Sequence, residues 1–172
     1  MNHLIFILIG TLSVFPLRNE RPELVQVKSE FLDCIRSGGN CEGYTYEAMR
    51  LVYTSESSEA YTDNHAFVMA LKSSNNWQEL GPAYNQKVLE KAQAAANEGH
   101  PVVAVYFGQG KDPLHVAVIV PGSLTLSGSW GMQVPNSISL PDFEPDHSFI
   151  GKPLSYAFEK RNLLSLKIYS HG

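Results

Sequence analysis

The chain changes from helical to strand-like sequence near residue 100, and this change constrains the fold more than any other feature. Before this point, apolar residues recur with the spacing of amphipathic helices. The predicted helices cover residues 22–36, 40–52, 63–71 and 85–97. After it, apolar β-branched segments predict strands at 101–107, 115–120 and 163–169. Because helices precede strands instead of alternating with them, the sequence predicts an α+β fold, with an N-terminal helical half packed on a C-terminal antiparallel sheet.

Three connecting segments complete this prediction. Residues 54–60 are polar and are expected to form a loop, and residues 75–82 are expected to form a turn that buries Trp77 in the core. Pro121-Gly122 is expected to close a hairpin between the strand at 115–120 and a strand that begins at 124–126.

Composition indicates an ordinary folded domain. The chain has 172 residues, of which 44% are hydrophobic and 17% are charged, so one domain with its own core is expected. The net charge of -4 is mild and no basic stripe is present, which argues against nucleic acid as a partner.

The N-terminus carries an apolar segment over residues 4–15. It is too short for a stable membrane span, and its length and position are typical of a secretory signal peptide. We therefore predict a signal peptide at residues 1–17, a single domain at 18–172, and an extracytoplasmic location, periplasmic or secreted. The alternative is that the segment forms a buried N-terminal strand or helix.

The two cysteines, Cys34 and Cys41, allow a disulfide, a metal pair or two independent thiols. No CxxC spacing is present, so a structural zinc site is not expected. Cys34 falls among apolar positions of the first helix and is predicted to be core. Cys41 follows a glycine-rich segment and is expected on the first turn of a helix capped by Asn40, where the helix dipole favours a thiolate. The alternative is a buried structural cysteine.

His115 is the histidine best placed to act as a base. Of the six histidines, it alone follows a turn and begins a predicted strand. A thiol at a helix start and an imidazole at a strand start can form a nucleophile and general base, although a histidine satisfied within the core is the alternative. A third polar residue normally orients the base. The predicted hairpin nominates Ser127 and Ser129 for this role, and Asn136 is a further candidate.

Two aromatic residues are candidates for contact with a substrate. Tyr44 lies on the helix that Cys41 is expected to begin. Trp130 lies among Gly128, Ser129 and Gly131, and this loop-like setting favours an exposed aromatic platform.

The segments around Cys41 and His115 resemble a known family. Asn40-Cys41-Glu42-Gly43-Tyr44 followed by Leu51-Val52-Tyr53 is similar to the nucleophile helix of NlpC-type and CHAP-type cell-wall amidases. The segment 115–120 is similar to their histidine strand, and residues 92–104 to the preceding helix and strand in some relatives. The resemblance covers roughly residues 30–130 and includes the order of the motifs, with the cysteine helix before the histidine strand.

The sequence also departs from this family. Glu42 stands where many relatives have serine, and residues 124–130 lack the Glu and Asn that CHAP members often carry after the histidine strand. The span from Cys41 to His115 exceeds that of compact NlpC domains, and an inserted helix within 62–98 accounts for the excess.

The resemblance implies a papain-like cysteine hydrolase that cleaves amide bonds in bacterial peptidoglycan through an acyl-enzyme. Cys41 would be the nucleophile and His115 the general base, with no metal and no cofactor. The expected partner is a peptidoglycan stem peptide or muropeptide, and an immunity protein joins it if the chain is an antibacterial effector. The alternative is a secreted binding module or inactive relative in which Cys41 and His115 are structural.

Overall fold

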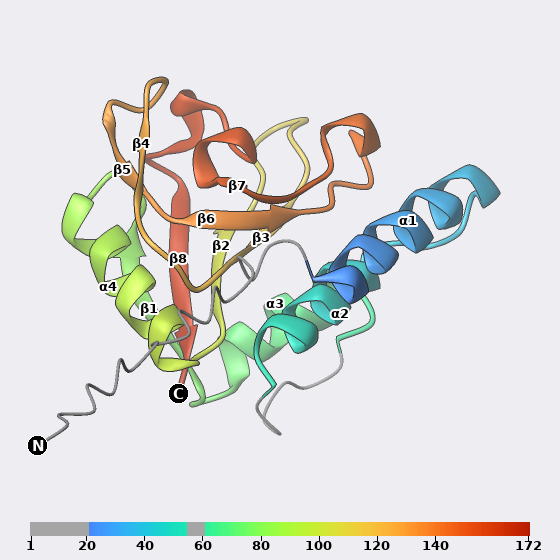
Figure 1. Cartoon of the computed structure of the whole chain (residues 1–172), viewed down its shortest axis with the longest axis horizontal. Coiled ribbons are helices and arrows are strands. Elements are labelled where there is room, and N and C mark those ends of the chain that lie inside the picture. The colour runs from blue at the N-terminus through green and yellow to red at the C-terminus, as the bar shows by residue number, and fades with distance from the viewer. Residues whose placement is uncertain (1–20, 55–60) are drawn as a thin grey trace, which may run out of the picture.

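A computed structural model describes residues 21–54 and 61–172, which contain four α-helices and eight β-strands (Figure 1). The helices are α1 (Pro22–Ser37), α2 (Gly43–Val52), α3 (Asn64–Ser73) and α4 (Gln86–Glu98). The strands are β1 (Trp77–Pro82), β2 (Val102–Tyr106), β3 (His115–Ile119), β4 (Thr125–Ser127), β5 (Met132–Val134), β6 (Asn136–Ser139), β7 (Phe149–Pro153) and β8 (Leu166–His171). The predicted signal peptide at 1–17 and nearly all of the predicted loop at 54–60 lie outside the described residues.

Six of the strands form one sheet in the order β1-β8-β2-β3-β6-β7, and β4 and β5 pair separately as a two-stranded ladder. Every pairing is antiparallel. Three of the four helices precede β1, and the remaining seven strands all follow α4. The predicted α+β class, with helices first and an antiparallel sheet second, is confirmed.

The structure corrects two expectations about the strands. The segment expected to form a turn at 75–82 is the edge strand β1, although Trp77 is buried as predicted. The strand after Pro121-Gly122 does not pair with β3, because the chain leaves the sheet through the β4–β5 hairpin and returns at Asn136. Val120 N–H donates to the Asn136 carbonyl, and β6 continues from there as the neighbour of β3.

The core lies between the central strands and the helices. Every residue of β2 and β3 is buried, so these strands have the continuous apolar character of fully covered strands. The helix α2 packs against β3 and β6, and α4 packs against β1, β2, β3 and β8. In Figure 1, α4 lies at one side of the sheet and the α1–α2 pair at the other.

A side-chain contact ties the end of α2 to the end of β3. Tyr53, which follows α2 directly, donates its buried hydroxyl to the carbonyl of Ile119, the last residue of β3. A buried hydroxyl requires such a partner, so this contact fixes where α2 ends relative to the sheet.

No helix among the described residues is both long and apolar enough to cross a membrane.

A sharp reversal joins α1 to α2. Gly38 ends α1 with a φ of 73°, a left-handed conformation that favours glycine. The N–H groups of Gly38 and Gly39 donate to the carbonyls of Ile35 and Cys34. A Cβ at Gly39 would lie only 3.1 Å from the sulfur of Cys34, so the turn packs closely beneath that residue.

The reversal brings the two cysteines together as a disulfide. The Cα atoms of Cys34 and Cys41 lie 5.9 Å apart and their sulfur atoms are bonded. This pairing is one of the three arrangements that the sequence allows. Cys34, predicted to be core, is only partly buried and packs against the core. A disulfide is compatible with an extracytoplasmic setting, where such bonds persist.

The disulfide predicts a simple result for thiol counting. Because both cysteines of the chain are bonded to each other, protein unfolded in denaturant without reductant should take up no iodoacetamide. After reduction it should take up two equivalents, as read by intact-protein mass spectrometry. Two alkylated cysteines in the unreduced sample would contradict the disulfide.

Candidate functional site

The segment around Cys41 differs from its prediction in two ways. The helix begins at Gly43, with Glu42 at the N-cap position, and Asn40 instead accepts a hydrogen bond from Glu42 N–H through its side-chain oxygen at 3.3 Å. Cys41 is only 2% exposed and its sulfur is bonded to Cys34. The predicted free thiolate is therefore absent from this oxidised state, because a disulfide sulfur has neither a proton to lose nor a charge to attack with.

Glu42, where the resemblance leads one to expect serine, has a structural role. Its carboxylate accepts a hydrogen bond at 2.7 Å from the N–H of Asn64, the first residue of α3. This contact satisfies one of the free N–H groups at the start of that helix. Glu42 thus joins the start of α2 to the start of α3.

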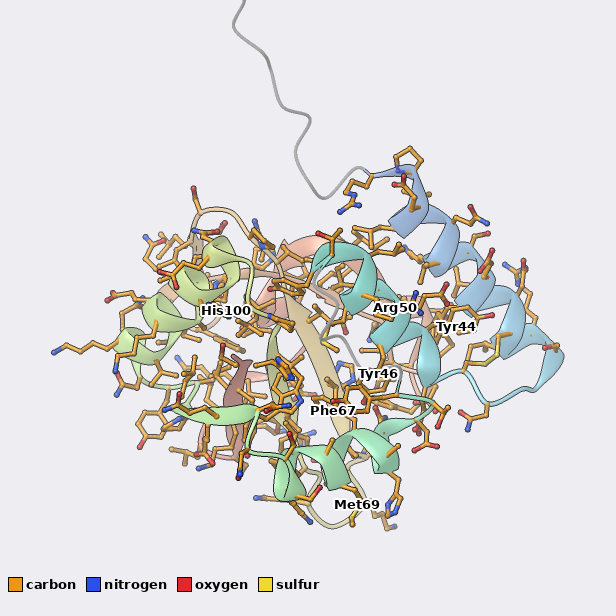
Figure 2. All side chains as sticks on the ribbon, turned by 90° about the horizontal axis from the view of Figure 1, so that it is seen from below. Tyr44, Tyr46, Arg50, Phe67, Met69 and His100 are labelled. Atoms are coloured by element: carbon orange, nitrogen blue, oxygen red, sulfur yellow. A yellow bond between two sulfur atoms is a disulfide. The ribbon has the colours of Figure 1, made fainter. Side chains whose placement is uncertain are left out.

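Tyr46 reinforces the same junction from the other side. Its hydroxyl donates to the Asn64 side-chain oxygen at 2.6 Å, and its ring packs on Phe67 of α3 with centroids 5.0 Å apart (Figure 2). Burial, together with the carboxylates of Glu42 and Asp63, raises the pKa of Tyr46 well above its usual value. The hydroxyl therefore remains protonated and keeps its role as donor.

Tyr44 lines a hollow at the start of α2. The hollow measures about 350 Å³ and includes Asn40 and Gly43, which lie on either side of Cys41 in the sequence, but not Cys41 itself. Arg50 and Glu47 supply charges of both signs to its wall. Figure 2 shows Tyr44, Tyr46 and Arg50 along α2.

His115 begins β3, as the sequence predicts, and it is 6% exposed. Its ring lies between Phe143 and Phe158, with centroids 5.4 Å and 4.9 Å away. Burial lowers the pKa of His115 to about 4, because an apolar environment disfavours the charged imidazolium. At neutral pH the ring is therefore uncharged.

Ser139, which the sequence did not nominate, is the polar partner of this ring. Its Oγ lies 3.0 Å from Nε2 of His115. Ser139 is 1% exposed and lies at the end of β6, paired with Ala117. Nδ1 of His115 has no hydrogen-bond partner among residues 21–54 and 61–172, so one ring nitrogen is held and the other remains available.

Ser127, Ser129 and Asn136, the residues predicted to orient His115, do not hydrogen-bond to it. Ser129 lies beside Ser127 in the β4–β5 hairpin, with their hydroxyls 3.2 Å apart. Asn136 is next to Val120, at the opposite end of β3 from His115, and its side chain contacts Thr125. The prediction of Ser129 assumes that β3 pairs with the segment after Pro121-Gly122, whereas that of Asn136 rests on the ability of an amide to accept a proton from the imidazole. Only knowledge that β6 is the neighbour of β3 would have identified Ser139.

Trp130 is also not the exposed platform predicted from its glycine-rich setting. It is 5% exposed, and its indole N–H donates to the Phe158 carbonyl. Its backbone N–H donates to the Ser127 hydroxyl. Trp130 therefore anchors the hairpin to the segment after β7, and its side chain is part of the packed core.

A second, smaller hollow of about 130 Å³ opens beside His115. Its wall also holds Tyr106, Asp112, Phe143, Phe158, Glu159 and Arg161. Arg161 lies 2.8 Å from Glu159 and 3.9 Å from Asp112. The wall of this hollow is thus apolar where the two phenylalanines lie and charged where Arg161 pairs with Glu159 and Asp112.

No hydrogen bond joins Cys41 to His115 in the described parts of the chain. Among the described residues, His115 contacts Ser139 and two phenylalanines, and the hollows beside the two predicted catalytic residues share no lining residue. What connects them is the packing of α2 on β3. No group of three metal-ligating side chains occurs in the described parts of the chain.

Neither a protein-family model nor a curated protein matches this chain.

The buried imidazole predicts how stability depends on pH. The pKa of His115 is about 4 when folded and about 6.5 when unfolded, so the unfolded chain binds the extra proton between these values. The contribution of the neutral His115 to the free energy of unfolding is fully present above pH 6.5. It falls as the pH drops towards 4, by at most ~3 kcal/mol. In urea titrations, H115Q should show a smaller loss of unfolding free energy from pH 7 to pH 4.5 than wild type. Equal losses would contradict the buried neutral histidine.

Proposed function

We propose that this chain is a cysteine-dependent amide hydrolase of papain-like architecture, whose nucleophile Cys41 is stored as a disulfide with Cys34. One observation carries the proposal: the helix that follows Cys41 packs against the strand that begins with His115. The resemblance of these same two segments to NlpC-type and CHAP-type amidases supports it from the sequence.

The relative direction of α2 and β3 supports the pairing. The two elements end together, where the Tyr53 hydroxyl meets the Ile119 carbonyl. Ten helical residues and five strand residues both extend over roughly 15 Å. We infer from this common end that the two elements lead back towards starts on the same side of the domain, with Cys41 just before the helix and His115 at the start of the strand.

Reduction is the first chemical step in this proposal. Two thiol groups of a reductant, such as a dithiol, transfer two electrons and two protons to the Cys34–Cys41 bond and become a disulfide themselves. The product has two free thiols. Cys41 then lies just before the N-terminus of α2, where the helix dipole stabilises the thiolate.

His115 then serves as the base. The uncharged ring accepts the Cys41 proton at Nδ1, the nitrogen without a partner among the described residues, while Ser139 holds Nε2. The thiolate adds to the carbonyl carbon of the amide, and the imidazolium returns the proton to the leaving amine. Water, deprotonated by the same ring, hydrolyses the thioester and regenerates Cys41.

The proposed substrate is the peptide part of bacterial cell wall, a stem peptide or muropeptide. The family resemblance suggests this choice, and a disulfide is compatible with a protein that meets its substrate outside the cytoplasm. If the enzyme acts on the wall of competitors, an immunity protein that blocks the site would be its partner.

A second function has an observation of its own. The oxidised, 2% exposed Cys41 and the aromatic packing of His115 are also what a binding module with structural cysteine and histidine would have. In that protein the disulfide would be permanent and no hydrolysis would follow its reduction.

Three variants distinguish the two functions. With purified peptidoglycan and mass spectrometry of the released muropeptides, wild type should cleave only after reduction by a dithiol. C34A should cleave without reductant, since Cys41 can no longer be bonded to it. C41A should lose more than about a thousandfold in rate under both conditions, as expected when a nucleophile is removed.

C34A and C41A are a matched pair, because each removes the same disulfide and one sulfur. Circular dichroism of both variants shows whether a loss of cleavage activity is caused by unfolding. Full cleavage by reduced C41A would exclude Cys41 as the nucleophile. Folded C34A and folded, reduced wild type that both leave peptidoglycan intact would favour the binding module.

A further inference from the structure

The β4–β5 hairpin and the segment after β7 enclose a third hollow of about 540 Å³. Its lining includes neither His115 nor any residue of α2, and it shares no residue with the two hollows described above. Thr125, Ser127 and Ser129 of the hairpin line it, together with Pro153 at the end of β7 and Ser155 and Tyr156 in the following turn. In Figure 1 the hairpin stands apart from the main sheet, at the top of the view.

The lining of this hollow carries no charge. It consists of threonine, serines, glycine and proline with two large exposed side chains, Leu126 and Tyr156. Leu126 is 67% exposed and Tyr156 is 65% exposed. Large apolar groups left in water on one concave surface are characteristic of a binding site.

The ring of Tyr156 is held in place although it is exposed. The ammonium of Lys152 lies 5.5 Å from its centroid, and Phe149 meets it edge to face at 6.3 Å. These contacts restrict the ring before any ligand arrives, which lowers the entropic cost of binding. The hairpin side is also ordered, because Ser127 accepts from Trp130 N–H and lies 3.2 Å from the Ser129 hydroxyl.

We propose that this hollow binds a neutral glycan chain built from N-acetylhexosamine units. A pyranose ring has an apolar face of C–H groups that suits an aromatic ring such as that of Tyr156, and an edge of hydroxyls that suits serine and threonine. Leu126 offers an apolar contact for an acetyl methyl group. No charged side chain lines the hollow, and the nearby Lys152 ammonium lies over the rings of Phe149 and Tyr156. The lining therefore offers no charged partner of the kind that selects phosphate, carboxylate or amine groups.

The choice of N-acetylhexosamine over other sugars rests on the proposed function, because the glycan strands of cell wall consist of such units. The glycan site would then hold the strand while the hydrolase cleaves its attached peptides. Binding at this site does not need Cys41, so the two proposals can fail separately.

The test is isothermal titration with N-acetylglucosamine tetramer, with glucose tetramer as the comparison ligand, using C41A so that no catalysis interferes. The N-acetylated tetramer should bind more tightly than the glucose tetramer. Adding Y156A should weaken its binding at least tenfold, whereas Y156F should retain it. Y84A is the matched control, since Tyr84 is 53% exposed and lies outside the lining of the hollow.

Three results would overturn the site. These are absence of binding by folded C41A, equal binding by C41A with and without Y156A, and equal affinity for the two tetramers. Because Tyr156 is largely exposed, thermal melting should show that Y156A leaves the fold intact. Glycan binding together with inactive C34A would retain this site and reject the hydrolase.

Discussion

The bond between Cys34 and Cys41 is the constraint on which the rest of this site depends. It clamps the segment before α2 to the last turn of α1, and through Glu42 the same segment is joined to α3. Closing so short a loop stabilises the fold by roughly 2.5 kcal/mol in the chain-entropy model. The same bond converts both thiols of the chain into a disulfide. One covalent link therefore orders the start of α2 and also leaves Cys41 without a thiol.

In the proposed hydrolase His115 would be the base, and its surroundings keep the ring uncharged in the oxidised protein. Two aromatic rings keep water from the imidazole and lower its pKa to about 4, so the ring is neutral while no thiolate is near. A thiolate brought close would favour the imidazolium and raise that pKa. Ser139 restricts the ring through Nε2, which is the part of a catalytic triad that orients the base.

The helical half, the strand at His115 and the α+β class could be predicted from the sequence, because they depend on local periodicity. The partner of His115 could not. Ser139 reaches it only because β6 is the neighbour of β3, and the intervening hairpin hides that pairing from any reading of consecutive strands. The prediction for Trp130 was wrong for a related reason. Its glycine-rich loop suggested an exposed ring, but the ring is buried and its indole N–H donates to the carbonyl of Phe158, which is distant in the sequence. The disulfide stood among the predicted alternatives, and spacing alone did not select it.

The most direct test is the pKa of the Cys41 thiol in C34A, measured as the rate of iodoacetamide reaction against pH. The proposed nucleophile, stabilised as a thiolate by the start of α2 and by an imidazolium formed at His115, should give a pKa well below the free-thiol value of about 8.5. A pKa at or above 8.5 in folded C34A would contradict the account, because burial without an activating partner raises the pKa of a thiol.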